Sequence, residues 1–445
     1  MTGILVRFAN SLRVARLAAG EARVAYLPEE VLLARQTARF QALVQFAHDR
    51  VPYYRAWMRG AGAQPGDLRS PADLARLPVV DKLDLVLQPE QFTAEGAERR
   101  DGLTLLSSGT SGRRRSFRHD TPALLEALAA GRRQRLALQT FLGRETAYRE
   151  AVFNRVGSTG DQLRRFWESR TVNPAVLDLR RRLFSPALPF PRLLEEVNAF
   201  RPEVYRGIGS HLGAFLRWVL ETGRPLVKPR VVTYGGDAMP AGDRRLIEED
   251  LGIPVVSTYQ AVEALRIGFQ CEVRGGFHVS VDQVAVRVLD ARGRDTAPGE
   301  PGELVLTNLA CRATVVIHYR LGDIVTRDGG VCPCGRTLPL ISNIDGRLDD
   351  LLVRPGGGRI HAFSVIPQLQ SVPGLRQVQI VQKSMDTFHV RAVWARGAAA
   401  APDALAVRMR EVLGPAIQVT VEPVGMLPQG PGGKVKTVIR EGIEP

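Results

Sequence analysis

The chain has 445 residues, of which 44% are hydrophobic, and this length is too great for one ordinary core, so two or three domains are expected. Its net charge of +14 comes mainly from arginine and is spread along the chain, with no clustered basic face of the kind that nucleic-acid-binding modules carry. No apolar run of about 18 residues or more occurs, and Arg7, Arg13 and Arg16 interrupt the apolar N-terminus, so neither a transmembrane segment nor a signal peptide is expected.

Helices and short buried strands are predicted to alternate in the first half of the chain. Residues 28–60 carry apolar side chains at mixed three- and four-residue spacing, which is typical of helix. The segments VVTYGG at 231–236 and PVVSTY at 254–259 are expected to be buried strands on either side of a helix over 240–251. This order indicates a parallel α/β layer. The basic N-terminal helix could touch a membrane, but packing onto the main body is favoured.

The second half of the chain changes character. Residues from about 279 to 345 are rich in β-strand patterns, and the tail after them holds further strands and a helix over 402–413. The tail is long enough to form an α+β domain of its own. We therefore predict an N-terminal region over residues 1–345 and a C-terminal domain over residues 346–445, joined at the GRLDD segment.

The loop LLSSGTSGRRRSF at 105–117 has the composition of a phosphate-binding loop. Hydroxyl side chains can donate to phosphate oxygens, glycines let the backbone approach closely, and arginines supply cations. The candidate contacts in this loop are Ser107, Ser108, Gly109, Thr110, Ser111 and Gly112.

Three further segments follow predicted strands, where α/β folds place ligand-binding loops. They are YGGDAMP at 234–240, TYQAVEA at 258–264 and HYRLGD at 318–323. A carboxylate at such a turn can accept both hydroxyl protons of a ribose. Asp323 of the third segment is such a carboxylate, and Tyr259 and Glu263 stand in the second segment.

Two segments of the tail complete the set: DGRLDDLLVRPGG at 345–357 and GPGGKVKTVI at 430–439. All six, in this order, resemble the motifs of the adenylate-forming superfamily of acyl- and aryl-CoA synthetases. LVQFAHDRVPYYRAWMRGAG, DLARLPVVDKLDL and CPCGRTLP are similar to the phenylacetate–CoA ligase branch in particular. The resemblance implies an α/β fold with a multi-subdomain N-terminal region and a small mobile α+β C-terminal domain.

The resemblance also implies roles for individual residues. Gly235, Gly236 and Asp237 would line the adenine and acyl pockets. Tyr259 would stack on adenine, Asp323 would bind the ribose and Glu263 would hold Mg²⁺ near the phosphates. In the tail, Arg347 would contact the nucleotide and Asp349 would be the pivot between the two domains. Lys434 would be the catalytic lysine, because an ammonium beside a carboxylate and an α-phosphate stabilises the charge that develops during adenylation; Lys436 is the alternative.

The implied reaction joins a carboxylate to AMP, using ATP and Mg²⁺, and passes the acyl group to a thiol. CoA is the expected acceptor and an aryl or arylacetic acid the expected substrate. A carrier-protein thiol or an amine remains open as acceptor, as does a homodimer. A degenerate, non-catalytic homologue also remains open, because Gln260, Val262 and the arginines after Gly112 depart from the family pattern. No nucleic-acid partner is expected.

Cys271, His278, Cys332 and Cys334 form a candidate Cys₃His zinc set. Four cysteines in this length do not make a disulfide scaffold, and the tight Cys-Pro-Cys suggests metal binding in a reducing compartment, so a cytoplasmic protein is expected. Related ligases of the branch carry these positions, and such a zinc would be structural, with all four ligands from protein. Cys311 is expected to be buried.

Overall fold

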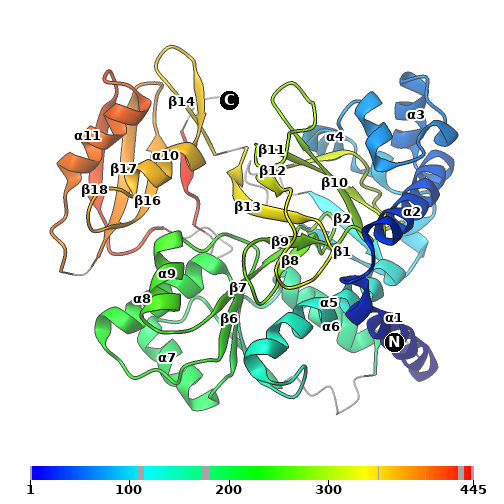
Figure 1. Cartoon of the computed structure of the whole chain (residues 1–445), viewed down its shortest axis with the longest axis horizontal. Helices are drawn as coiled ribbons and strands as arrows, with labels where there is room; N and C mark the ends of the chain where they lie inside the picture. The colour runs from blue at the N-terminus through cyan, green and yellow to red at the C-terminus, as the bar shows by residue number, and fades with distance from the viewer. Residues whose placement is uncertain are drawn as a thin grey trace. The chain divides into compact units, whose positions relative to one another are not determined.

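The computed structural model describes residues 3–107, 115–172, 180–348, 350–395, 397–428 and 435–441. The chain divides into two compact units (Figure 1). The first unit comprises Met1–Glu150, Asn154–Leu183 and Val256–Ile344, and the second comprises Ala151–Phe153, Phe184–Val255 and Asp345–Pro445.

Helices cover the first unit. The predicted helical stretch over 28–60 is confirmed as two helices, α2 (Glu29–Arg50) and α3 (Pro52–Gly60). The break falls at Val51, which is extended at φ −121° and ψ 111°, as expected for a residue that precedes proline. The other helices of this unit are α1 (Ile4–Val24), α4 (Lys82–Leu87), α5 (Thr121–Leu142) and α6 (Thr159–Arg170), and the short 3-10 helices are η1 (Pro65–Asp67), η2 (Pro71–Arg76), η3 (Pro89–Phe92) and η4 (Ala97–Arg99).

The β-rich character predicted for the middle of the chain is confirmed in the same unit. Its main sheet has the order β10-β11-β12-β13-β9-β8-β7, and β1 pairs with β2 in a separate antiparallel ribbon. The strands are β1 (Gly102–Leu106), β2 (Ser116–Asp120), β7 (Val255–Tyr259), β8 (Gly268–Gln270), β9 (Phe277–Val279), β10 (Val284–Leu289), β11 (Pro301–Asn308), β12 (Tyr319–Asp328) and β13 (Leu340–Arg347).

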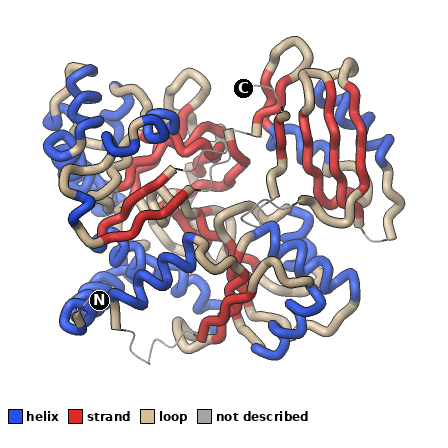
Figure 2. Tube along the Cα trace, turned by 180° about the vertical axis from the view of Figure 1, so that it is seen from behind, coloured by secondary structure: helices blue, strands red, loops and turns tan. Residues whose placement is uncertain are grey.

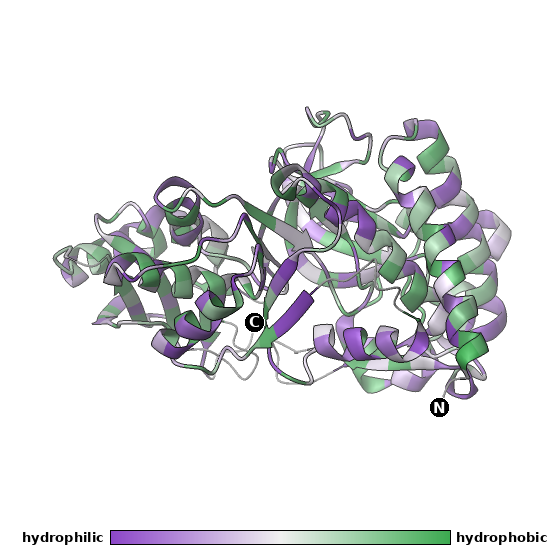
Figure 3. Ribbon diagram, turned by 90° about the horizontal axis from the view of Figure 1, so that it is seen from below, coloured by the Kyte–Doolittle hydropathy of each residue, from purple (hydrophilic) through white to green (hydrophobic). Residues whose placement is uncertain are grey.

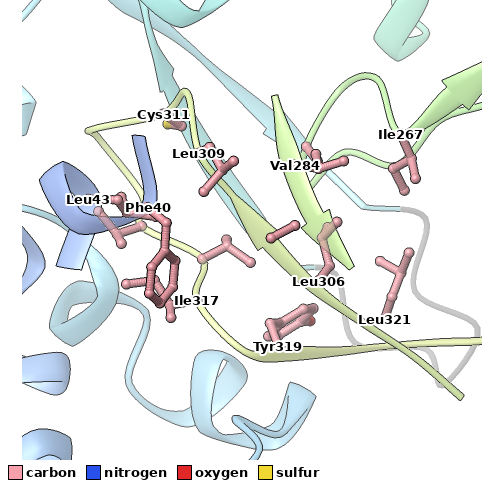
Figure 4. Packing of buried hydrophobic residues seen from close by; sticks show 14 of the residues in the cluster. Phe40, Leu43, Ile267, Val284, Leu306, Leu309, Cys311, Ile317, Tyr319 and Leu321 are labelled. Carbon is pink, nitrogen blue, oxygen red and sulfur yellow. The ribbon is translucent and has the colours of Figure 1, made fainter. Parts of the chain in front are cut away.

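The core of the first unit joins this sheet to the N-terminal helices. Phe40 and Leu43 of α2 are buried in one cluster with Leu306 of β11 and Ile317 (Figure 4). Tyr54 of α3 ties the same layer together by accepting a hydrogen bond from the backbone N–H of Ile317 at 2.8 Å.

The first part of the second unit is an α/β layer. The strand predicted over 231–236 and the helix after it are confirmed here as β6 (Val231–Tyr234) and α9 (Ala241–Glu249), and the strand predicted over 254–259 is confirmed as β7 of the first unit. β5 pairs in parallel with β6, with Val204 opposite Val231. The remaining elements are β5 (Val204–Gly207), α7 (Phe190–Phe200) and α8 (Gly209–Thr222), and the boundary between the units falls within β3 (Arg149–Phe153) and β4 (Arg180–Phe184).

The last part of the second unit is an α+β layer, as predicted for the tail. Its sheet has the order β18-β17-β16-β19, and helix α11 lies at the predicted residues 402–413 (Figure 2). Helix α10 was not predicted, and it contains Pro367. The elements are β14 (Leu351–Val353), β15 (Arg359–His361), α10 (Ala362–Leu369), β16 (Leu375–Gln382), β17 (Thr387–Trp394), α11 (Pro402–Leu413), β18 (Gln418–Pro423) and β19 (Val438–Arg440).

Candidate nucleotide and metal sites

The first unit brings two of the predicted nucleotide-binding residues into direct contact. The hydroxyl of Tyr259, the last residue of β7, donates to Oδ2 of Asp323 at 2.8 Å, and both residues are buried. This hydrogen bond fixes the position of the Asp323 carboxylate relative to the ring of Tyr259. The predicted adenine-contacting ring and ribose-binding carboxylate are therefore neighbours.

Asp323 lies on a bulge within β12 and not, as predicted, at a turn after a strand. Glu303 of β11 pairs with Ile324, whereas Val305 pairs with Arg320. Between these two pairs β12 advances by four residues while β11 advances by two. Gly322 takes the extra length with a φ of +79°, a conformation that favours glycine. Because a bulge re-aims the side chains beside it, the carboxylate of Asp323 leaves the regular alternation of the strand.

The backbone around Glu263 is held from two other strands. His119 of β2 donates from Nε2 to the carbonyl oxygen of Val262 at 2.8 Å, and Asn308 of β11 donates from Nδ2 to the carbonyl oxygen of Glu263 at 2.9 Å. Burial lowers the pKa of His119 to about 4, so the ring is neutral at neutral pH and carries the proton on Nε2. Glu263 is itself buried, at 6% exposure.

The two ends of the predicted phosphate loop lie together at the base of the β1–β2 ribbon. Ser107 N donates to the carbonyl oxygen of Arg115 at 2.8 Å, and Arg115 Nε donates to Ser107 Oγ at 3.3 Å. Arg115 Nη1 also donates to the hydroxyl of Tyr319 at 3.0 Å. Ser108, Gly109, Thr110, Ser111 and Gly112 lie outside the described residues.

The predicted YGGDAMP loop follows β6 in the second unit. Gly236 has a φ of +84°, and the carboxylate of Asp237 accepts hydrogen bonds from the hydroxyl and backbone N–H of Ser210 in the first turn of α8. Gly235 N donates to the carbonyl oxygen of Gly207 at the end of β5, at 3.1 Å. The loop is thus fixed at the carboxyl ends of two parallel strands, where α/β folds bind ligands.

The predicted residues of the tail are only partly described. Arg347 is the last residue of β13, while Asp349 and Lys434 lie outside the described residues. Lys436 is exposed, and its carbonyl oxygen accepts a hydrogen bond from Gln379 Nε2 at 2.7 Å.

The four predicted metal ligands meet at the end of the first unit's sheet. One ligand atom from each of them lies within 4.8 Å of all the others. Cys271 Sγ is 3.6 Å from Cys332 Sγ, and Cys334 Sγ is 3.4 Å from His278 Nε2. Burial lowers the pKa of His278 to about 4, which keeps the imidazole neutral. Three sulfurs and a neutral imidazole, closely gathered and largely buried, fit a tetrahedral zinc site with all its ligands from protein.

Secondary structure explains how these distant ligands meet. His278 lies on β9, which pairs with β13 so that His278 stands opposite Leu340. Cys271 directly follows β8, the other neighbour of β9. Cys311, as predicted, is separate from the cluster: it is fully buried, and burial raises the pKa of its thiol to about 12.

Known proteins are similar to this chain in both sequence and fold. A family model for the CapK C-terminal domain matches residues 352–441. The phenylacetate–coenzyme A ligase of Thermus thermophilus is 26% identical over 455 positions, which cover 93% of this chain and 97% of that protein. Along nearly its whole length the chain is therefore similar in sequence to a phenylacetate–CoA ligase.

Two further similarities agree with this placement. The phenylacetate–coenzyme A ligase of Escherichia coli K12 is 25% identical over 346 positions, or 73% of each chain. A solved 2-hydroxyisobutyryl-CoA ligase, in the postadenylation state in complex with R3-HIB-AMP, matches with a TM-score of 0.74 at 22% identity over 95% of this chain and 92% of its own. The fold class predicted for this phenylacetate–CoA ligase-like chain is therefore confirmed.

Sequence reasoning missed the residues that support the site of this phenylacetate–CoA ligase-like chain. Tyr319, His119 and Asn308 hold predicted residues or their backbone, as described above. Tyr319 could have been found from the sequence, because it belongs to the HYRLGD segment, whereas His119 and Asn308 lie in strands that carry no motif.

Among the described residues, none of the helices combines the length and the hydrophobicity that a membrane span requires.

Proposed function

We propose that this chain is an ATP-dependent, AMP-forming carboxylate ligase. In the first step a carboxylate attacks the α-phosphate of ATP, which gives an acyl-adenylate and releases pyrophosphate. In the second step a thiol attacks the acyl carbonyl and AMP leaves, with CoA as the expected thiol. The observation that carries the proposal is the hydrogen bond between Tyr259 and Asp323, in a chain similar to phenylacetate–CoA ligases along nearly its whole length.

The nucleotide would be bound mainly by the first unit. The ring of Tyr259 would stack on adenine, while its hydroxyl orients the Asp323 carboxylate, which would accept hydrogen bonds from the ribose hydroxyls. Glu263 would hold Mg²⁺, which neutralises negative charge on the phosphates. His119 and Asn308 would act as positioning residues, since they fix the backbone on either side of that carboxylate.

The phosphates would be bound by backbone and hydroxyl groups. The loop from Ser107 to Gly112 would donate to the β- and γ-phosphates, and the bonds between Ser107 and Arg115 would close its base. The loop Gly235–Asp237 and Arg347 would contact the rest of the nucleotide.

The C-terminal domain, residues 346–445, would present Lys434 during adenylation. The ammonium would lie between the attacking carboxylate and the α-phosphate, where it stabilises the charge of the transition state. Rotation of the domain about Asp349 would then withdraw the lysine and open the way for the thiol.

A structural Zn²⁺ is proposed for Cys271, His278, Cys332 and Cys334. The ion would join the turn after β8, strand β9 and the Cys-Pro-Cys loop before β13. It would leave no open coordination position and take no part in the reaction.

The aryl or arylacetic acid named as substrate rests on the similarity to phenylacetate–CoA ligases, and the two steps can be tested separately. Pyrophosphate release is measured over a panel of aryl, arylacetic and short aliphatic acids, with and without CoA, and the acyl product is identified by mass spectrometry. We expect release with an aryl or arylacetic acid and a thioester only when CoA is present. Glu263→Gln, which retains the shape of the side chain but loses its charge, is the negative control.

Other outcomes would redirect the proposal. Pyrophosphate release without any thioester would favour a carrier-protein thiol or an amine as acceptor. No release with any acid, from protein that still binds ATP, would favour a non-catalytic homologue.

A further inference from the structure

Helix α1 is attached to the first unit through its polar side chains. It packs against α5 and α6. Arg7 and Asn10 donate to the carbonyl oxygens of Thr171 and Arg170 at the end of α6, at 2.8 and 2.9 Å. Ser11 Oγ accepts from the backbone N–H that follows Thr171, at 2.7 Å. These bonds fix which face of α1 is turned toward the unit and which face is turned to solvent.

The face turned to solvent is apolar. Ile4, Leu5, Phe8 and Leu12 are 65%, 81%, 57% and 57% exposed. Ile4, Phe8 and Leu12 follow one another at four-residue intervals and so form one stripe, with Leu5 beside it. A surface helix of a globular protein normally turns its apolar stripe inward and its polar side chains to water. The first three turns of α1 depart from this arrangement, whereas Val24 at its end is buried in the core; Figure 3 shows hydrophobic and hydrophilic residues alternating along the helix that begins at the N-terminus.

Only positive charge accompanies this stripe on the helix. Arg13, Arg16 and Arg23 are exposed, while the one acidic residue of α1, Glu21, is buried and paired with Arg133 of α5. If two copies met through this face, the arginines of one would approach those of the other with no acid of α1 between them. A surface of anionic lipid offers phosphates to the arginines and hydrocarbon to the apolar stripe, so it complements both features.

We propose that α1 binds the surface of an anionic membrane. The helix would lie in the plane of the interface, with Ile4, Leu5, Phe8 and Leu12 at the boundary between headgroups and acyl chains and the arginines at the lipid phosphates. Attachment through four apolar side chains and a few charges is reversible, and salt weakens it.

The test is co-sedimentation of the purified full chain with vesicles of phosphatidylcholine, alone or mixed with phosphatidylglycerol, at low and high salt. We expect binding to the anionic vesicles only, and less at high salt. Phe8→Glu combined with Leu12→Glu should lower the bound fraction roughly tenfold or more, because two apolar side chains leave the bilayer. Arg13→Gln combined with Arg16→Gln should weaken binding by roughly fivefold per arginine.

Leu87→Glu is the matched control. Leu87 is a similarly exposed leucine, at 61%, at the end of α4, so its replacement should leave vesicle binding unchanged. All variants should keep the melting temperature of the unaltered chain, since the replaced side chains face solvent. The proposal is overturned if the unaltered chain ignores anionic vesicles, or if the double glutamate variant binds them equally well. A different result would assign the face to a second copy of the chain: the unaltered chain does not bind vesicles and is a dimer in sedimentation velocity, and the double glutamate variant is a monomer.

Discussion

Asp323 illustrates how a single residue of the site depends on its local backbone. The bulge at Gly322 re-aims the carboxylate, and the hydroxyl of Tyr259 holds one of its oxygens. A hydrogen bond to a charged group contributes about 1.5–3 kcal/mol. The bond therefore matters to the affinity of the site as well as to its shape.

Tyr259→Phe should raise the KM for ATP roughly tenfold or more, since it frees Asp323 to reorient while leaving the ring in place. The effect should appear in pyrophosphate release and leave the melting temperature nearly unchanged. Tyr205→Phe is the matched control, because Tyr205 is a buried tyrosine of β5 whose hydroxyl donates to the carbonyl oxygen of Val227 at 3.3 Å. An unchanged KM for Tyr259→Phe would remove this residue from the proposed nucleotide site.

Lys434→Ala should slow adenylate formation roughly 100- to 1,000-fold, because a lost contact to transition-state charge costs about 3–4 kcal/mol. Transfer from a pre-made acyl-adenylate to CoA should be largely spared. Lys436→Ala serves as the comparison, since Lys436 is exposed and its backbone is bound by Gln379. If Lys436→Ala slows adenylation and Lys434→Ala does not, the catalytic role passes to Lys436.

At the scale of secondary structure, the sequence predicted most elements that build the site. β6, α9 and β7 followed from apolar runs around an amphipathic segment, and α11 followed from its spacing. Helix α10 escaped prediction because Pro367 interrupts it. The bulge in β12 escaped because it depends on pairing with β11, which no local pattern records. His119 and Asn308 escaped for the same reason: their partners are at Val262 and Glu263, far along the chain.

The zinc cluster gives a prediction about the elements it joins. Freshly purified protein, kept free of chelator, should contain about one zinc per chain. Cys332→Ser should lose the metal and lower the melting temperature, because the turn after β8 is no longer tied to the loop before β13. Cys311→Ser is the control, since Cys311 is buried elsewhere and its variant should keep the zinc even if it is less stable. Metal analysis that finds no zinc in the unaltered protein would disprove the site.

At the scale of the whole molecule, three buried histidines away from the metal cluster couple stability to pH. Burial lowers the pKa of His119, His211 and His318 to about 4, and at His318 a hydrogen bond from Arg287 also favours the neutral ring. Below the usual histidine pKa of about 6.5 the unfolded chain takes up these protons and the folded chain does not. The free energy of unfolding should therefore fall between about pH 6.5 and pH 4, by up to roughly 3 kcal/mol for each ring.

Urea unfolding across this range of pH tests the coupling. His318→Gln should flatten the slope between pH 6.5 and pH 4 while lowering stability at neutral pH. His48→Gln is the control, because the side chain of His48 is partly exposed and lies outside the buried set. An equal slope in the His318→Gln and unaltered proteins would contradict the assignment.

The proposed rotation of the C-terminal domain also belongs to this scale. Proline fixes φ near −65°, so Asp349→Pro should hold the chain in one orientation. Pyrophosphate release in a single turnover should continue, while thioester formation should fall steeply. Asp349→Ala removes the side chain but leaves the backbone angles unrestricted. It therefore distinguishes loss of the side chain from restriction of the backbone as the cause of a defect. Equal loss of both steps in folded Asp349→Pro protein would favour an acceptor that enters without domain rotation.

The proposed zinc site bears on how the chain folds. Cys271 and Cys332 are 61 positions apart; Cys271 follows β8, one neighbour of β9, and Cys332 precedes β13, its other neighbour. If the metal binds only once these strands have paired, its free energy is added after the main barrier to folding. An interaction formed after the barrier slows unfolding and leaves the rate of folding nearly unchanged. The cluster would thus act chiefly on the lifetime of the native state.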